Sequence, residues 1–166
     1  MRKIYCGGRF DFDYLKEGYK DAAAKDYRAI LLGDEELLLK RSASVKINEQ
    51  TEYIGPFYFE TNGMQDLDIV KSEWEMVKEC TDAVFLLDDA CCPGTVCELT
   101  AASMLGKRVH IFYIRKGDGE ETESSLHTPC WYPIIHSLTV NENTSICECK
   151  DHENAAYKIN ALVRVK

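Results

Sequence analysis

The sequence has no excess of basic residues and no long apolar run. Its 20 Lys and Arg are outnumbered by 28 Asp and Glu, which leaves a formal net charge of −8. It therefore lacks the basic surface that binds nucleic acid. No stretch approaches the roughly 20 apolar residues that a membrane-spanning helix requires. We expect neither a nucleic acid polymer nor a membrane among its partners.

We also expect no secretory leader. The opening residues, Met-Arg-Lys-Ile-Tyr-Cys-Gly-Gly, reach glycine before an apolar signal-peptide core could form. The sequence contains no internal repeat and no linker, and 166 residues suffice for one domain with a sizeable core. We expect a cytoplasmic protein with a single domain over residues 1–166.

Paired cysteines at zinc-binding spacing are missing, although the chain has eight cysteines. A structural zinc site usually needs two pairs at C-x₂₋₄-C spacing. Only Cys91-Cys92 and Cys147-x-Cys149 come near, and neither has a second pair. In a strand, Cys147 and Cys149 would share a face shortly before His152, so a metal there is the alternative to ordinary buried thiols. We favour buried, reduced thiols and expect no cofactor and no metal.

Apolar strands alternate with amphipathic helices along most of the chain. Strands are expected at 3–6, 83–87 and 109–114, and helices at about 14–30, at 66–80, after the Pro93-Gly94 turn and after Asp151. A less regular region at 34–60 suggests a short helix at 35–40 and strands at 44–47 and 51–60. This alternation predicts a doubly wound parallel sheet.

The most informative stretch runs from residue 82 to residue 106. Its apolar run 83–87 has no polar side, as is typical of a strand buried on both faces. Asp88 and Asp89 follow the strand, and Glu98 lies early in the next helix. Since ligands bind outside the carboxyl ends of such strands, these three acids are candidate catalytic residues.

Glu98 has two interpretations. Thr95-Val96-Cys97-Glu98 fits a capping box, in which both side chains satisfy backbone N–H groups and have no other function. Alternatively, a carboxylate near a helix N-terminus is held ionised and can attack an electron-poor carbon. An anomeric carbon suits this chemistry, with Asp88 or Asp89 protonating or positioning the leaving group.

Gly7 and Gly8 directly follow the first strand. Bare backbone there can approach a ligand or cradle an anion, but the glycines could equally serve a tight turn. Arg9, next along, could pair with a phosphate group or simply lie in solvent.

Three motifs together resemble the nucleoside 2-deoxyribosyltransferase family, which includes the related nucleoside 5′-monophosphate N-glycosidases. They are the opening Lys3-Ile-Tyr5-Cys-Gly-Gly, the run Asp82-Ala-Val-Phe-Leu-Leu-Asp with Pro93-Gly-Thr-x-x-Glu98-Leu-x-x-Ala102, and Gly106-Lys-Arg-Val109. The similarity is strongest over residues 66–114, plausible over 1–30 and absent after about residue 125.

The resemblance implies a flavodoxin-like α/β sandwich, with a mainly parallel sheet of about five strands and helices on both faces. Glu98 matches the nucleophile that takes the deoxyribosyl group from a base and passes it to another base or to water. Tyr5 matches a tyrosine near that glutamate. The Gly7-Gly8 loop and the Gly94-Thr95 turn match segments near the sugar or the 5′ phosphate. The substrate would be a nucleoside or nucleotide, and members are homo-oligomers, dimers or larger.

The sequence departs from the family pattern at two acids. Cys92 stands where an acid usually precedes the turn. Trp74, flanked by Glu73 and Glu75, stands where the preceding helix usually has an aspartate. Glu73 is therefore a candidate substrate-binding residue. The alternative is a non-catalytic nucleotide-binding or signalling module on the same fold, in which these acids are dispensable.

Overall fold

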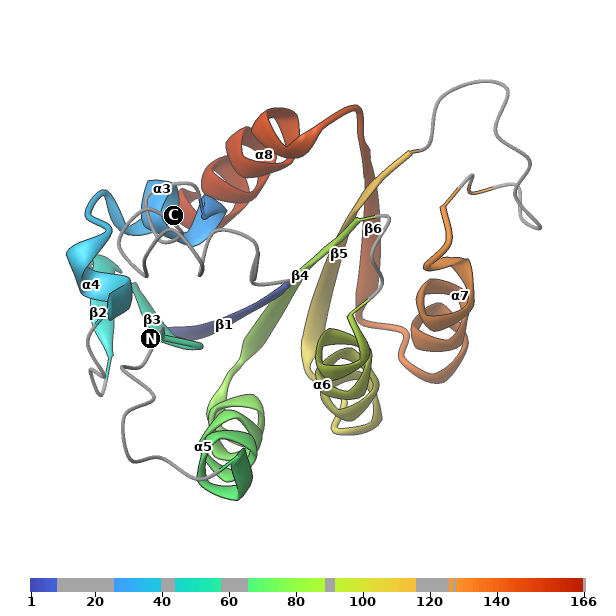
Figure 1. Ribbon diagram of the computed structural model, residues 1–166, viewed down its shortest axis with the longest axis horizontal. Helices are drawn as coiled ribbons and strands as arrows, with labels where there is room; N and C mark the ends of the chain where they lie inside the picture. Colours follow the sequence, from blue (N-terminus) through green and yellow to red (C-terminus); the bar gives the residue numbers. More distant parts are fainter. Residues whose placement is uncertain are drawn as a thin grey trace.

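A computed structural model describes residues 1–8, 26–39, 44–57, 66–88, 92–115, 126 and 128–165. These residues form one six-stranded sheet with helices on both faces (Figure 1). The strands are β1 (Arg2–Gly8), β2 (Val45–Asn48), β3 (Thr51–Gly55), β4 (Asp82–Leu87), β5 (Arg108–Ile114) and β6 (Thr144–Cys149). The helices are α3 (Tyr27–Leu32), α4 (Glu36–Leu39), α5 (Asp66–Glu79), α6 (Pro93–Met104), α7 (Trp131–Val140) and α8 (His152–Arg164).

The strand order is β2-β3-β1-β4-β5-β6, and every pair is parallel except β2 with β3. Without the antiparallel edge strand β2, the parallel strands run in the flavodoxin-like order 2-1-3-4-5. The expected α/β fold with a mainly parallel sheet is confirmed. The additional edge strand arises from the tight turn that links β2 to β3, where the Asn48 side chain accepts a hydrogen bond from the Gln50 N–H at 2.9 Å.

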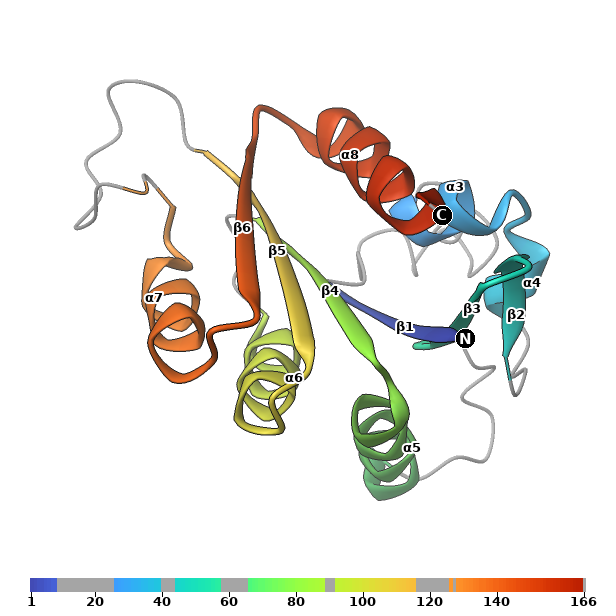
Figure 2. The same cartoon turned by 180° about the vertical axis from the view of Figure 1, so that it is seen from behind.

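Helices α5, α6 and α7 cover one face of the sheet, and α3 and α8 cover the other (Figures 1 and 2). Alternate residues of β4 feed the two resulting cores. Val84 and Leu86 pack in the core beneath α3 and α8, whereas Phe85 and Leu87 pack in the core beneath α5, α6 and α7. Burial on both faces explains the unbroken apolar run of this strand.

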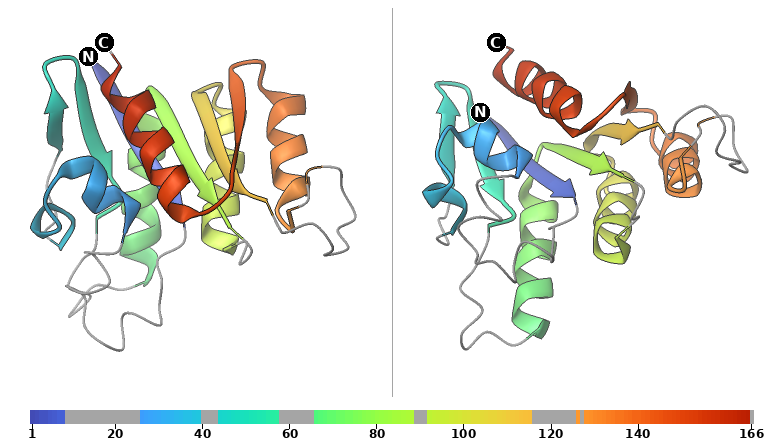
Figure 3. Two further views of the ribbon diagram at one scale, coloured as in Figure 1. Left: turned by 90° about the horizontal axis from the view of Figure 1, so that it is seen from above. Right: turned by 45° about the horizontal axis from the view of Figure 1, so that its top comes forward.

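Both chain termini lie at the sheet edge where β1 begins (Figure 3). At the opposite end of the strands lie the carboxyl ends of β1 and β4, and this is where ligands bind in such folds. Among the described residues, no helix is both long enough and apolar enough to span a bilayer.

The capping-box interpretation of Thr95 and Glu98 is wrong. Helix α6 begins at Pro93 with Cys92 as its N-cap, so Thr95 already lies in the first turn and Glu98 in the second. Proline is favoured at a first helical position because its missing N–H is not needed there. Glu98 is therefore not the third residue after a cap and has no capping role.

Helical spacing predicts that Ile69, Val70, Trp74 and Val77 form the buried stripe of α5, and this prediction is partly wrong. Val77 is buried, but Val70 is 62% exposed and Trp74 45% exposed. The face turned toward the protein carries Glu73 and Met76 together with Val77. Apolar periodicity alone did not predict the buried face of α5 correctly, because the helix carries apolar residues on its outer face as well.

Candidate functional site

The candidate site lies where β1 and β4 end side by side, at the point where the strand order reverses. Helix α5 packs on one side of this point, against β1 and β3, and helix α6 packs on the other side, against β4 and β5. Tyr5 and Gly7 of β1 pair in register with Ala83 and Phe85 of β4. The topology therefore brings the first strand and the central stretch to one ligand-binding edge.

Glu98 reaches from the second turn of α6 to the backbone of β1. A Cβ atom placed on Gly7 would lie 3.1 Å from the Glu98 Oε2 and 2.5 Å from the Phe85 ring. Such distances leave no space for a side chain at position 7. Gly7 thus allows the Glu98 carboxylate and the end of β1 to approach each other closely.

Glu73 of α5 and Glu98 of α6 share this space, and each carboxyl group influences the pKa of the other. Burial first, and then the negative charge of Glu73, raise the pKa of Glu98 to about 8. Burial also raises the pKa of Glu73. Two neighbouring carboxyl groups that are shielded from water do not both ionise readily, so the pair retains one proton near neutral pH.

Tyr5 is completely buried against the same pair, and its ring lies 6.3 Å from that of Phe85. The hydroxyl of Tyr5 lowers the pKa of Glu98, yet it reaches no full-strength hydrogen bond with any described residue. Burial and the two glutamates raise the pKa of Tyr5, so the hydroxyl stays protonated. A buried donor without a good acceptor is rare and is typical of a functional site.

Arg28 is fully buried on the α3 side of β1. Its guanidinium forms an ion pair with Asp26 at 2.5 Å and donates to the Cys6 carbonyl at 3.3 Å. The neighbouring Tyr27 hydroxyl donates to the Gly7 carbonyl at 2.9 Å. Consecutive carbonyls at the end of β1 are thus fixed by consecutive side chains of α3.

Arg28 also lowers the pKa of both Glu73 and Glu98. It is a functional candidate that sequence reasoning missed. The signal for it was weak, a single arginine within an otherwise apolar helical run.

Asp88 lies at the end of β4, next to the first turn of α8. Its carboxylate is 3.4 Å from the His152 Nε2, and its carbonyl accepts a hydrogen bond from the Cys130 thiol at 3.2 Å. This places the Asp88 carboxylate beside α8, whereas Glu98 packs on the α6 side. Glu73, rather than Asp88, therefore lies beside Glu98.

The remaining candidates differ in their placement. A Cβ on Gly8 would be 3.3 Å from the Leu86 carbonyl, so this glycine also serves close packing. Thr95 is buried, whereas Gly94 is exposed in the first turn of α6, where no described side chain caps the helix. Arg9 and Asp89 lie outside the described residues.

The cysteines of the described chain are free thiols, including Cys147 and Cys149. Burial raises the pKa of Cys80 and of Cys149 to about 11, which leaves both protonated and unreactive. Within the described ranges, no group of three or more His, Cys, Asp or Glu side chains could hold a metal ion.

The chain is similar over nearly its whole length to the solved structure of a CMP N-glycosidase, BcmB, from Clostridium botulinum. The two share 14% sequence identity with a TM-score of 0.55, and the match covers 97% of this chain and 99% of the other. A likeness at this identity establishes the fold. No family model and no curated protein matches the sequence.

Proposed function

We propose that the protein cleaves the N-glycosidic bond of a nucleoside or nucleotide, with Glu98 as the nucleophile. The observation that carries this proposal is the Glu73–Glu98 pair, half-buried beside the Tyr5 hydroxyl at the reversal point of the sheet. The pair provides an acid and a nucleophile in one place. The fold neighbour's own N-glycosidase activity supports the same class of reaction.

The position of the single proton decides which glutamate acts as the acid and which as the nucleophile. The raised pKa of Glu98 leaves the resting proton of the pair on Glu98. The reactive arrangement has the proton on Glu73 and the negative charge on Glu98, and the Tyr5 hydroxyl favours it by lowering the pKa of Glu98. Glu73 then acts as the general acid, which is commonly a carboxyl group whose pKa is raised by burial.

The first step breaks the bond between the sugar C1′ and the base nitrogen. A Glu98 oxygen forms an ester bond to C1′ while the base leaves with the bonding electrons and takes the proton of Glu73. The negative charge of Glu98 stabilises the cationic character that develops at C1′.

The second step resolves the ester. Either water or the nitrogen of a second base attacks C1′, Glu98 leaves as a carboxylate, and Glu73 accepts the proton of the attacking group. Hydrolysis and transfer therefore use the same residues and differ only in the group that attacks.

The sugar and its 5′ substituent would bind along the end of β1 and the first turn of α6. Gly94 is exposed and leaves backbone accessible there, and the N–H groups at the start of α6 suit an anion. Arg9 would place a positive charge next to a 5′ phosphate. This favours a nucleotide over a nucleoside as the substrate.

The test is chromatography of free bases after incubation with deoxynucleosides, ribonucleosides and their 5′-monophosphates. The wild type is compared with Glu98→Gln, which keeps the shape of the side chain but cannot attack, and with Glu75→Gln as a surface control. Release of base by the wild type and the control alone supports the proposal. The absence of product across the panel, together with tight nucleotide binding, would instead assign a non-catalytic binding module.

A further inference from the structure

A second cluster of charged residues lies at the opposite edge of the sheet, where β1 and β4 begin. The Asp82 carboxylate is 1% exposed and accepts from Arg2 at 3.0 Å through one oxygen and from Arg108 at 2.9 Å through the other. The Thr81 hydroxyl and His110 also approach it. Burial alone would raise the pKa of Asp82, but hydrogen bonds from His110, Thr81 and Arg2 lower it strongly.

The two arginines are not fully used by this carboxylate. Each guanidinium has five N–H donors, and in each case a single Nη2 is hydrogen-bonded to Asp82. The Arg2 Nε is buried without a hydrogen-bond partner in the described part of the chain. The Arg108 side chain is 56% exposed, so its remaining donors face solvent.

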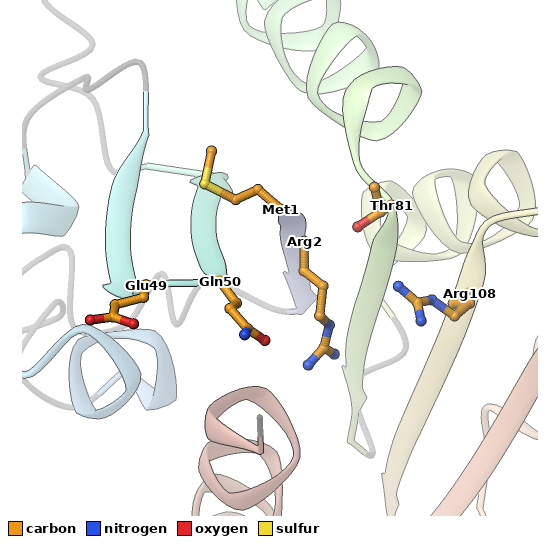
Figure 4. Close-up of a pocket in the computed structure, with 6 residues that line it drawn as sticks. All are labelled: Met1, Arg2, Glu49, Gln50, Thr81 and Arg108. Atoms are coloured by element: carbon orange, nitrogen blue, oxygen red, sulfur yellow. The ribbon is translucent and has the colours of Figure 1, made fainter.

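Arg2 and Arg108 border a pocket of about 390 Å³. Met1, Arg2, Glu49, Gln50, Thr81 and Arg108 line it. Figure 4 shows the Arg2 and Arg108 guanidinium groups on either side of β4, with the Gln50 side chain beside Arg2. Two guanidinium charges surround the single Asp82 carboxylate, and Glu49 adds a second negative charge to the lining of the pocket.

We propose that this pocket binds a phosphate group, free or carried by a small organic molecule, between the Arg2 and Arg108 guanidinium groups. A tetrahedral oxyanion can accept hydrogen bonds from two guanidinium groups at once, with two N–H donors from each. A single planar carboxylate such as Asp82 cannot accept from all of these donors. The Gln50 amide is placed to donate to a further oxygen. This site is separate from the Glu98 edge and does not depend on the proposed reaction.

Glu49 opposes the binding of an anion because its carboxylate also lines the pocket. Removing that charge should therefore tighten binding, and added salt should weaken it. These two effects distinguish an electrostatic phosphate site from a nonspecific cavity.

The experiment follows the arginine Nε–H signals of the ¹⁵N-labelled protein by NMR during titration with inorganic phosphate and, separately, with ribose 5-phosphate. Arg2→Lys and Arg108→Lys assign the two signals, and both variants retain a positive charge next to Asp82. We expect both signals to shift with a dissociation constant of about 1 mM or tighter. Tighter binding of ribose 5-phosphate would identify an organic ligand, and equal binding would identify free phosphate.

Charge variants complete the test. Arg108→Gln should weaken phosphate binding at least about tenfold, the loss expected for one charge-assisted contact, and Glu49→Gln should strengthen it. Lys71→Gln, which removes an exposed charge on α5, should leave it unchanged. The shifts should persist in Glu98→Gln. Stationary Arg2 and Arg108 signals, or unchanged affinity in Arg108→Gln, would overturn the proposal.

Discussion

The carboxyl groups of Glu73 on α5 and Glu98 on α6 interact with each other at the carboxyl ends of the parallel strands. They come from the helices that precede and follow β4 in the chain, and the negative charge of Glu73 raises the pKa of Glu98. Burial is the largest cause of both pKa shifts and strengthens the effect of Glu73 on Glu98. Several measurable properties depend on this pair.

Glu73→Gln should lower the rate of base release by roughly 10²-fold to 10³-fold, because it removes the general acid but leaves the nucleophile. A deoxyribosyl donor whose leaving group needs no proton should recover most of that loss. Glu98→Gln should remain inactive with both donors. Equal loss on both donors in Glu73→Gln would exclude Glu73 as the acid.

The stability of the protein should fall as pH rises through the titration of the pair. Because both folded-state pKa values are raised, the folded protein binds more protons than the unfolded chain between about pH 4.5 and pH 8. The stabilisation is complete below that window and is lost above it. Glu98→Gln should therefore gain on the order of 2 kcal/mol relative to wild type between about pH 5 and pH 8.5.

Thermal unfolding across this pH range measures the effect. Glu75→Gln is the matched control, since Glu75 is exposed and pairs with Lys78 at 2.8 Å. Its difference from wild type should stay constant with pH. A constant difference for Glu98→Gln would contradict the raised pKa of the pair.

Tyr5→Phe should reduce activity with almost no loss of stability. The Tyr5 hydroxyl has no full-strength hydrogen-bond partner among the described residues, so little is lost when it is removed from the empty protein. Tyr53→Phe is the contrast, because the buried Tyr53 hydroxyl donates to the Pro56 carbonyl. That variant should lose about 1 kcal/mol of stability. Chemical denaturation beside the base-release assay separates the two behaviours.

Gly7→Ala should disrupt both packing and activity. The new methyl group would lie 2.5 Å from the Phe85 ring and would press on Glu98, which we expect to cost about 1–3 kcal/mol. Gly94→Ala meets only the Cys92 thiol at 3.9 Å and should not lower the unfolding temperature. Similar unfolding temperatures for the two variants would refute the close approach at Gly7.

The expected homo-oligomer should assemble through the outer face of α5. Leu67, Val70 and Trp74 lie there at helical spacing and are 61%, 62% and 45% exposed. Clustered exposed apolar residues commonly mark protein interfaces. Light scattering should show a dimer or larger assembly for the wild type and a smaller species for Trp74→Glu. Lys71→Gln on the same helix should keep the wild-type mass.

The order of elements around the site could be predicted from the sequence because each depends on local patterns. The apolar run of β4 and the Pro-Gly signal before α6 place Glu98 at the right edge of the sheet. The capping box failed because Pro93 starts α6 two residues before Thr95, and a proline at the first helical position was the signal to weigh.

The partnership of Glu73 with Glu98 could not be derived from local patterns. It depends on how α5 rotates against the sheet, and apolar residues on both sides of α5 made that rotation ambiguous. Arg28 was missed for the same physical reason, since it acts across β1 through contacts distant in the sequence. Tertiary packing, rather than periodicity, decides which polar side chains meet.

The buried Arg28 has one more consequence. A guanidinium does not lose its proton in proteins, and Arg28 is held in place by Asp26 and by the Cys6 carbonyl. Its field at the two glutamates is therefore the same before, during and after a reaction cycle. Much of the cost of organising these charges is met when the protein folds, so the proposed bond cleavage would require little dipole rearrangement.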